Sequence, residues 1–344
     1  MYRLLILISF SLSTTVAFAQ IGGQAVYNSL RVPASAREAA LGGGMTAMKD
    51  GDISLSLRNP SLLDSASADK VSLGYIGYFA GTNVGVVSYG RRINEKLTGA
   101  LSVQYFSFGK MDETDASGNV IGSFSAGDFA VTAGAGYKID SLFSLGGGLR
   151  FVYSNLAQYT SAGIMADLAA TYHNPAKQFT AAIVVNHLGT EVDSYIDGQR
   201  SDLPVNISLG LTKKLPHAPF RFNVMIENLQ KWKLSYDESN DIVVDPVSGE
   251  IVEDSGFEFG DMLMRHIRLG TEFDISKSFQ FRFGYDYRRR QELGLADKPG
   301  MAGFSYGFGI RLTRFSISYG RAIYHLAGPS HHLTLSLPMS GSMR

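Results

Sequence analysis

The chain has 344 residues, with 31 basic and 31 acidic side chains, no cysteine, 38 glycines, 21 phenylalanines and 17 tyrosines. The charge balance argues against a nucleic-acid partner, because general nucleic-acid binders carry a basic excess. The lack of cysteine excludes disulfides, thiolate metal sites and cysteine nucleophiles. Abundant glycine with abundant aromatic residues favours strands and turns over helices.

Residues 1–19 have the pattern of a secretory signal peptide. Arg3 supplies the positive start, an apolar run follows, and Ala17-Phe18-Ala19 is a small-residue cleavage pattern. A membrane helix is the alternative, but the apolar run is shorter than the ~20 residues that a span needs. No cysteine follows the cleavage site, so the pattern is not that of a lipoprotein anchor. No later stretch is apolar for long enough to be a membrane helix.

Residues 20–67 differ from the rest of the chain. They contain helix-compatible pieces around 34–41 and 53–57, followed by the turn signal Asn59-Pro60. The chain then reads as strands almost without interruption.

Fourteen strands are predicted after residue 67. They are expected near 71–80, 83–93, 96–108, 124–139, 142–154, 159–173, 177–188, 203–215, 220–230, 263–275, 279–288, 300–312, 315–323 and 332–337. Most are about ten residues or longer, which is the length of a tilted membrane strand rather than of a strand in a soluble domain.

The connections between these strands alternate in length. Those after even-numbered strands are short (INEK, IDS, HNPAK, LPHAP, ISKS, LTR), and those after odd-numbered strands are mostly long. The AGTN and NLAQ connections are the exceptions. Outer-membrane barrels have short periplasmic turns and long external loops on alternate ends. This parity predicts an outer-membrane location, with both termini in the periplasm and the long loops extracellular.

The segment FQFRFGYDYR, residues 279–288, shows which side of the sheet meets lipid. Side chains alternate between the two faces of a strand, so aromatic residues share one face and charged residues the other. An arginine at the lipid midplane costs about 2–4 kcal/mol, so the charged face is predicted to line the interior. The predicted lumen charge network is Arg268, Glu272, Arg282 and Asp286.

A barrel of fourteen strands has a wide interior that its own small lumen residues cannot fill. Residues 20–67 are therefore predicted to form a hatch in the lumen of an all-β transmembrane barrel formed by residues 68–344. A large secreted sandwich is the alternative, although its aromatic faces would all need a second sheet.

Three stretches carry a resemblance to a known family: VPASAREAALGGG, DGDISLSLRNPSLL and VSLGYIGYFAGTNVGVVSYG. They resemble the N-terminal part of FadL-like outer-membrane barrels, and more narrowly the PorQ- and PorV-type proteins of the type IX secretion system, with PorQ the more similar. The resemblance implies a fourteen-stranded barrel with a hatch. It also implies work with PorU, PorV and PorZ, which attach cargo to lipopolysaccharide, so membrane lipid and lipopolysaccharide are expected partners.

The resemblance also assigns a structural hatch motif: Arg37, Gly42, Asn59 and Pro60. Arg37 is expected to pair with a lumen carboxylate, either Glu272 or Asp286. Many outer-membrane barrels end on an aromatic residue, whereas this chain ends on Arg344.

Motifs for catalysis or metal binding are incomplete. Gly303-Phe304-Ser305-Tyr306-Gly307 matches the nucleophile-elbow pattern, but it lies within a strand instead of at a strand–helix turn. Ser305 is therefore expected to be a small lumen-facing residue. His331 and His332 are adjacent, which is not a metal-ligand spacing. No enzyme activity, cofactor or metal is predicted.

The segment 237–261 contains nine carboxylates and no Lys or Arg. It is either a solvated loop or a partner-docking loop, with calcium binding disfavoured by the spacing. In the docking interpretation Phe257 and Phe259 are apolar anchors within an acidic frame that includes Asp254 and Glu258. VVDPVSGEIV within it is compatible with a small hairpin.

Two functions are consistent with these observations. The first, which depends mainly on the resemblance, is a non-enzymatic component of type IX surface attachment that docks partners through extracellular loops. The alternative is a FadL-like transporter of hydrophobic small molecules across the outer membrane.

Overall fold

The computed structural model describes residues 25–234, 243–244, 251–252, 259–294, 300–325 and 328–339. The predicted signal peptide, residues 1–19, lies outside these ranges.

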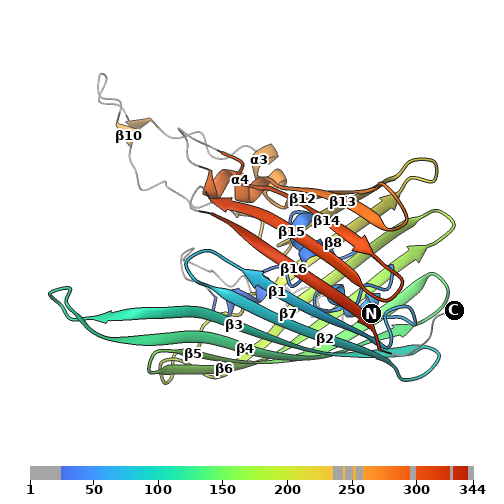
Figure 1. Ribbon diagram of the computed structural model, residues 1–344. Helices are drawn as coiled ribbons and strands as arrows, with labels where there is room; N and C mark the ends of the chain where they lie inside the picture. Colours follow the sequence, from blue (N-terminus) through green and yellow to red (C-terminus); the bar gives the residue numbers. More distant parts are fainter. Residues whose placement is uncertain are drawn as a thin grey trace, which may run out of the picture.

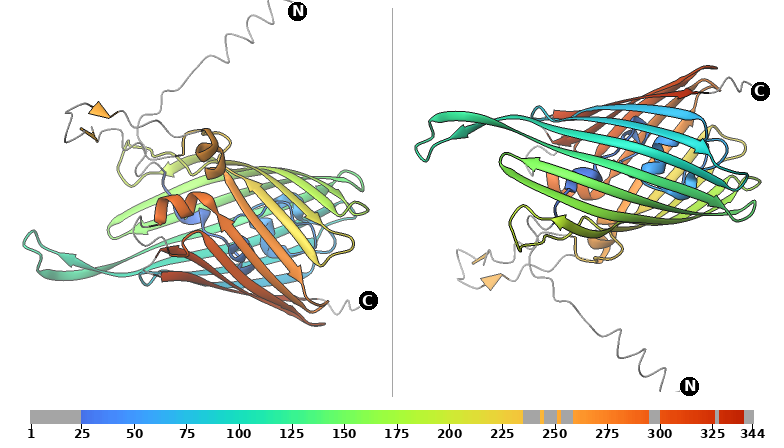
Figure 2. Two further views of the ribbon diagram at one scale, coloured as in Figure 1. Left: turned by 90° about the horizontal axis from the view of Figure 1, so that it is seen from above. Right: turned by 90° about the horizontal axis from the view of Figure 1, so that it is seen from below.

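Fourteen antiparallel strands close into a barrel (Figures 1 and 2). Each strand pairs with its neighbours in chain order, and β1 pairs with β16 to close the ring. The strands are β1 (Lys70–Gly77), β2 (Asn83–Arg92), β3 (Leu97–Thr114), β4 (Val120–Lys138), β5 (Phe143–Leu156), β6 (Tyr159–Asn174), β7 (Phe179–Asp193), β8 (Asn206–Lys214), β9 (Phe220–Ile226), β12 (Ile267–Asp274), β13 (Phe279–Asp286), β14 (Phe304–Arg311), β15 (Ser316–His325) and β16 (Gly328–Pro338). The predicted fold class and strand count are confirmed.

Strand ends differ from the prediction at two places where a helix replaces part of the predicted strand. The strand predicted over 279–288 ends at Asp286, because its carboxylate caps helix α4 (Tyr287–Leu293) and accepts a 3.0 Å hydrogen bond from the Arg289 N–H. Tyr287 therefore leaves the strand face. The strand predicted from residue 263 begins at Ile267, after helix α3 (Phe259–Arg265).

The long and short connections lie at opposite ends of the barrel. We call these the long-loop end and the short-turn end. At the long-loop end β3 and β4 extend past their neighbours as a projecting hairpin (Figure 1). The predicted small hairpin is also present, with Val243 of β10 (Val243–Val244) paired to Val252 of β11 (Ile251–Val252).

The outward face of the barrel is apolar and the inward face is polar. On β13, Phe281 and Phe283 are 42% and 44% exposed, whereas Arg282 and Asp286 are 3% and 2% exposed. This confirms the predicted arrangement of the two faces. Within the described part of the chain, no helix has the length and apolar character needed to cross a membrane.

Residues 25–67 lie inside the barrel and are called the hatch (Figure 2). They form η1 (Asn28–Arg31), α2 (Ala36–Ala40), η2 (Ile53–Leu57) and η3 (Pro60–Leu62). Helix α2 contacts β13 to β16, while η3 contacts β4 to β6. The Ser35 hydroxyl accepts from the Glu38 N–H, and the Glu38 carboxylate accepts from the Ala34 N–H, so both side chains satisfy free donors at the start of α2.

Candidate functional site: the interface between hatch and barrel wall

One buried carboxylate organises the contact between the hatch and the wall. Glu272 of β12 is fully buried and accepts two 2.8 Å hydrogen bonds from the Arg37 guanidinium. It also accepts from Arg282 at 3.0 Å and from Arg221 at 2.9 Å. The strand register explains this cluster, because Arg221, Glu272 and Arg282 stand opposite one another on β9, β12 and β13. Of the two carboxylates considered for Arg37, the structure places Glu272 against it.

The hatch contributes carboxylates of its own to the same cluster. Asp50 accepts from Arg37 at 2.7 and 2.9 Å and from Arg221 at 2.7 Å, and Asp52 lies 3.3 Å from Arg37. Burial alone would raise the pKa of Asp50, but the two guanidinium groups outweigh it and hold that pKa well below its usual range. Burial alone would lower the pKa of Arg37, and its carboxylate partners raise that pKa well above the ordinary value.

A second ion-pair cluster lies nearer the long-loop end. Asp286 is 3.0 Å from Arg268 and 3.4 Å from Arg289, and Arg268 is also 2.7 Å from Glu227. Arg268 donates to the backbone carbonyl of Gly43 in the hatch. The four residues of the predicted charge network are thus divided between two clusters, and each cluster contacts the hatch.

The first half of the hatch motif needs glycine for a close approach. Gly42 has φ +95°, and its N–H donates to the Ser305 hydroxyl at 2.9 Å. Ser305 in turn donates to the Ala40 carbonyl at 3.1 Å. A Cβ added to Gly284 of β13 would lie 2.1 Å from the Gly42 nitrogen, so this approach requires glycine at position 284, while the positive φ favours glycine at position 42. Ser305 therefore binds the hatch backbone.

The second half of the motif begins η3. The Asn59 amide oxygen accepts from the Ser61 N–H at 2.9 Å, and Pro60 occupies the first turn. The Asn59 amide nitrogen donates to the Thr46 carbonyl at 2.7 Å and to the Thr171 hydroxyl of β6 at 3.2 Å. Asn59 thus joins two parts of the hatch to the wall.

On the opposite wall the hatch meets the barrel through an apolar cluster. Its members from the hatch are Tyr27, Leu30, Ala34 and Leu57, and its members from the wall are Ile76, Val84, Val86, Phe106, Ala130, Val152 and Met165. The Arg150–Asp167 ion pair, at 3.1 Å, lies within this wall, and Arg150 donates to the Leu57 carbonyl of the hatch. Together with hydroxyl contacts such as that between Ser61 and Thr171, these contacts define the hatch interface with β1 to β6.

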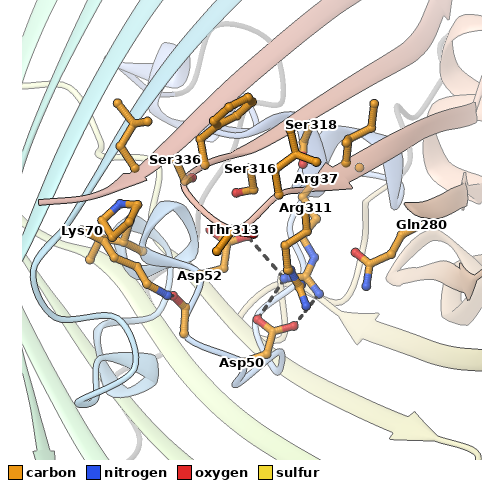
Figure 3. A pocket seen from close by; sticks show the side chains of 18 of the residues that line it. Arg37, Asp50, Asp52, Lys70, Gln280, Arg311, Thr313, Ser316, Ser318 and Ser336 are labelled. Carbon is orange, nitrogen blue, oxygen red and sulfur yellow. Dashed lines mark hydrogen bonds and ion pairs between the residues drawn. The ribbon is translucent and has the colours of Figure 1, made fainter. Parts of the chain in front are cut away.

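A cavity of about 690 Å³, lined by both charged and apolar residues, opens at the short-turn end (Figure 3). Its lining includes Arg37, Asp50 and Asp52 of the hatch, Lys70 of β1, and serines of β15 and β16. A second cavity, of about 10 Å³, lies between Leu30 and Leu57 of the hatch and Gln104 of the wall. That volume is about one water molecule, so the hatch closes this side of the lumen.

The remaining candidate residues from the sequence do not lie together in one site. His331 is exposed, whereas His332 is buried and hydrogen-bonded to Ser330 at 2.9 Å. Asp254, Phe257 and Glu258 lie outside the described residues. Phe259 begins α3 with 71% exposure, and its ring lies 5.3 Å from that of Trp232. The described residues contain no cluster of three or more His, Asp or Glu that would hold a metal.

Sequence reasoning missed several residues of this interface. Asp50 and Asp52 pair with Arg37, and Arg58 pairs with Glu38 inside the hatch. Arg221 stands between two phenylalanines in the sequence, and only the register with Glu272 shows its partner. Charged residues in a segment expected to be buried are a signal that points to such pairs.

Comparison with known proteins places the fold. No family model matches the sequence, and a search of curated proteins finds no relative. The toluene transporter TbuX from Ralstonia pickettii is 11% identical, with a TM-score of 0.53 over 91% of this chain and 98% of that one. The monoaromatic hydrocarbon channel CymD is 14% identical, with a TM-score of 0.51 over 89% and 97%. A FadL homologue from Pseudomonas aeruginosa is 11% identical, with a TM-score of 0.50 over 90% and 98%. At these identities the likeness concerns the fold, which is that of FadL-like barrels.

Proposed function

We propose that the protein is a non-enzymatic outer-membrane barrel that admits small apolar molecules, with its long-loop end outside and its short-turn end in the periplasm. The outward apolar face supports the membrane location. Two structural neighbours are described as channels or transporters of aromatic hydrocarbons. This proposal corresponds to the alternative function stated above.

The apolar interface between the hatch and β1 to β6 is the observation that carries this proposal. A small apolar molecule that enters this interface leaves water, which is favourable. It takes the place of contacts between hatch and wall side chains that are themselves apolar. An apolar molecule that entered between the hatch and the charge clusters on β9, β12 and β13 would separate ion pairs. Each separated pair leaves a buried charge without its partner, which is costly. We infer that the route follows the apolar wall and needs a shift of the hatch there.

Uptake of radiolabelled toluene by cells producing the barrel tests this proposal. Phe106 is 1% exposed within the apolar cluster, whereas its neighbour Tyr105 points outward and is 56% exposed. Phe106→Gln is expected to slow uptake several-fold, and the matched control Tyr105→Gln is expected to leave it unchanged. Uptake equal to that of cells without the barrel, with the protein folded in the membrane, would overturn the proposal.

A second candidate is a component of type IX surface attachment with partners of the PorU, PorV and PorZ kind. It is supported by the sequence resemblance and by one observation at the long-loop end. Trp232 and Phe259 are 50% and 71% exposed with adjacent rings, and aromatic residues of this kind anchor protein interfaces. The solved neighbours give this candidate no support, since those reported above are named for small molecules or as a FadL homologue.

A pulldown from native outer membranes separates the two candidates. The full protein is compared with a deletion of residues 237–261, which removes the acidic segment and Phe259. Partners that co-purify with the full chain and are lost on deletion would favour attachment. Unchanged toluene uptake by the deletion variant, with no partner retained by either form, would favour passage.

A further inference from the structure

Arg321 interrupts the outward face of the barrel. Apart from the projecting β3–β4 hairpin and Asp193 at the last position of β7, outward positions of the described strands carry charge near the short-turn end, at Arg91 and Lys213. Arg321 instead stands well along β15 towards the long-loop end, opposite Tyr306 of β14 and His331 of β16. Tyr306 belongs to the outward aromatic phase of its strand, and so Arg321 is on the lipid-facing side.

The surroundings of Arg321 leave its charge without a counter-ion. Within the described part of the chain no carboxylate and no hydrogen-bond acceptor pairs with its guanidinium, and its Nε is buried without a partner. The guanidinium lies over the ring of Tyr306, with 6.0 Å from the guanidinium carbon to the ring centre. The lumen-facing arginines Arg268 and Arg282, by contrast, each pair with a carboxylate.

The neighbouring strands add polar groups in the register row that contains Arg321. His331 is directly opposite Arg321, and its Nδ1 is hydrogen-bonded to the Tyr319 hydroxyl at 2.8 Å, which leaves Nε2 available. The next strand contributes Gly77 opposite His331, and a Cβ there would meet only the edge of Tyr75 at 3.9 Å. Asn83 follows opposite Gly77 on β2. The row is therefore polar and has open space beside the histidine.

Apolar side chains flank this row on the side towards the short-turn end. Leu333 is 49% exposed, Leu73 is 41% exposed, and Tyr75 is 56% exposed on the outward face. Such a surface fits acyl chains against the apolar side chains on the short-turn side and a polar headgroup beside Arg321 and His331. Near a bilayer interface an outward arginine costs little, and it binds phosphate through two parallel N–H bonds.

We propose that Arg321 and His331 form a lipid-phosphate site, which holds the phosphate of a lipid A-type glycolipid against the outer wall of β14 to β16. Arg321 supplies the charge and the paired donors, His331 supplies a further hydrogen bond, and Tyr306 and Tyr319 fix the two side chains. The site depends on the proposed membrane location and orientation, but not on the passage of apolar molecules.

Native mass spectrometry of the detergent-purified barrel with added lipid A tests this site. Arg321→Gln is expected to lower the bound fraction at least about five-fold, because it removes the charge-assisted pair of hydrogen bonds. Arg321→Lys is expected to restore part of it, and His331→Gln to lower it less. Arg91→Gln, an outward arginine at the opposite end, is the matched control and is expected to bind like the wild type. Heat-modifiable mobility in SDS gels verifies that each variant is folded.

Three results would overturn the proposal. The first is binding by Arg321→Gln equal to the wild type. The second is equal binding of lipid A and its dephosphorylated form, which would make the acyl chains alone responsible. The third is displacement of lipid A by millimolar inorganic phosphate, which would assign the residues to free phosphate instead of a lipid headgroup. These experiments measure lipid binding and not uptake, so failure of the lipid-phosphate site is distinguishable from failure of the proposed passage of apolar molecules.

Discussion

The hatch contacts the two sides of the barrel through different kinds of interaction. Towards β9, β12 and β13 it is held by directional ion pairs, in which Glu272 alone serves three arginines. Towards β1 to β6 it is held mainly by apolar side chains and hydroxyl groups. Ion pairs fix one geometry, because a buried charge that loses its partner costs several kcal/mol. Apolar contacts are non-directional and tolerate a shift at smaller cost. We infer that the charged wall is the anchor of the hatch and that the apolar wall is the side that can open.

Removing the central carboxylate should weaken the contact between the hatch and the charged wall more than any other change. Glu272→Gln leaves the three guanidinium groups of Arg37, Arg221 and Arg282 short of one negative charge. We expect the free energy of hatch docking to fall by about 3–5 kcal/mol, the usual cost of an uncompensated buried charge. Protease cleavage within the hatch of the folded barrel measures this. Asp274→Asn, on the same strand but in a partly exposed pair with Lys214, is the control and should leave cleavage slow.

Gly284→Ala should weaken the anchor by a steric route. The new Cβ would lie 2.1 Å from the Gly42 nitrogen, and overpacking of this kind costs about 1–3 kcal/mol. We expect faster hatch cleavage with the barrel itself still closed. Gly85→Ala, where a Cβ meets nothing within 4 Å, should behave like the wild type. Equal cleavage of both variants would show that the Gly42 approach is not part of the anchor.

Asn59→Ala should loosen the opposite wall by a smaller amount. It removes the cap on η3 and the bonds to Thr46 and Thr171, and the loss of a cap costs about 1 kcal/mol. Hydrogen exchange of residues 59–63 in the folded protein should increase, while exchange around Gly42 should not. Asn94→Ala, which removes a cap in an exposed short turn, serves as the control.

The pH dependence of the anchor should be the smallest effect. The pKa of Asp50 is depressed in the folded protein, so its stabilisation is fully present above the unfolded value of about 3.8 and is lost only as pH falls well below it. Hatch cleavage should therefore be the same at pH 7 and pH 5 when assayed with a protease active at both. A marked rise in cleavage at pH 5 would show that Asp50 is not held by Arg37 and Arg221 as described.

The barrel can be predicted well because the alternation of apolar and polar residues can be recognised in each strand separately. Phe281 and Arg282 must point to opposite faces of a strand, and the aromatic face must meet lipid whatever the rest of the chain does. Pairing across the lumen is harder to predict. Arg37 contacts Glu272 instead of Asp286 because of the depth at which the hatch sits, and no single segment encodes that depth. The helix that starts after Asp286 was also missed, since the strand alternation continues through Tyr287 while the carboxylate caps the backbone.

The most direct test of the account is to lock the hatch to one wall at a time with an engineered disulfide, which is clean in a chain without cysteine. Pro60→Cys with Gly134→Cys joins the hatch to β4, since a Cβ on Gly134 lies 3.7 Å from that of Pro60, within the range that disulfides need. Leu41→Cys with Gly270→Cys joins it to β12, where the corresponding distance is 3.1 Å, so the two backbones must separate by a few tenths of an ångström to reach the ~3.5 Å that a disulfide needs. We predict that oxidation of the β4 lock stops toluene uptake, that reduction restores it, and that the β12 lock leaves uptake unchanged. Unchanged uptake through the oxidised β4 lock, or a block by the β12 lock, would contradict the assignment of an anchored and an opening side.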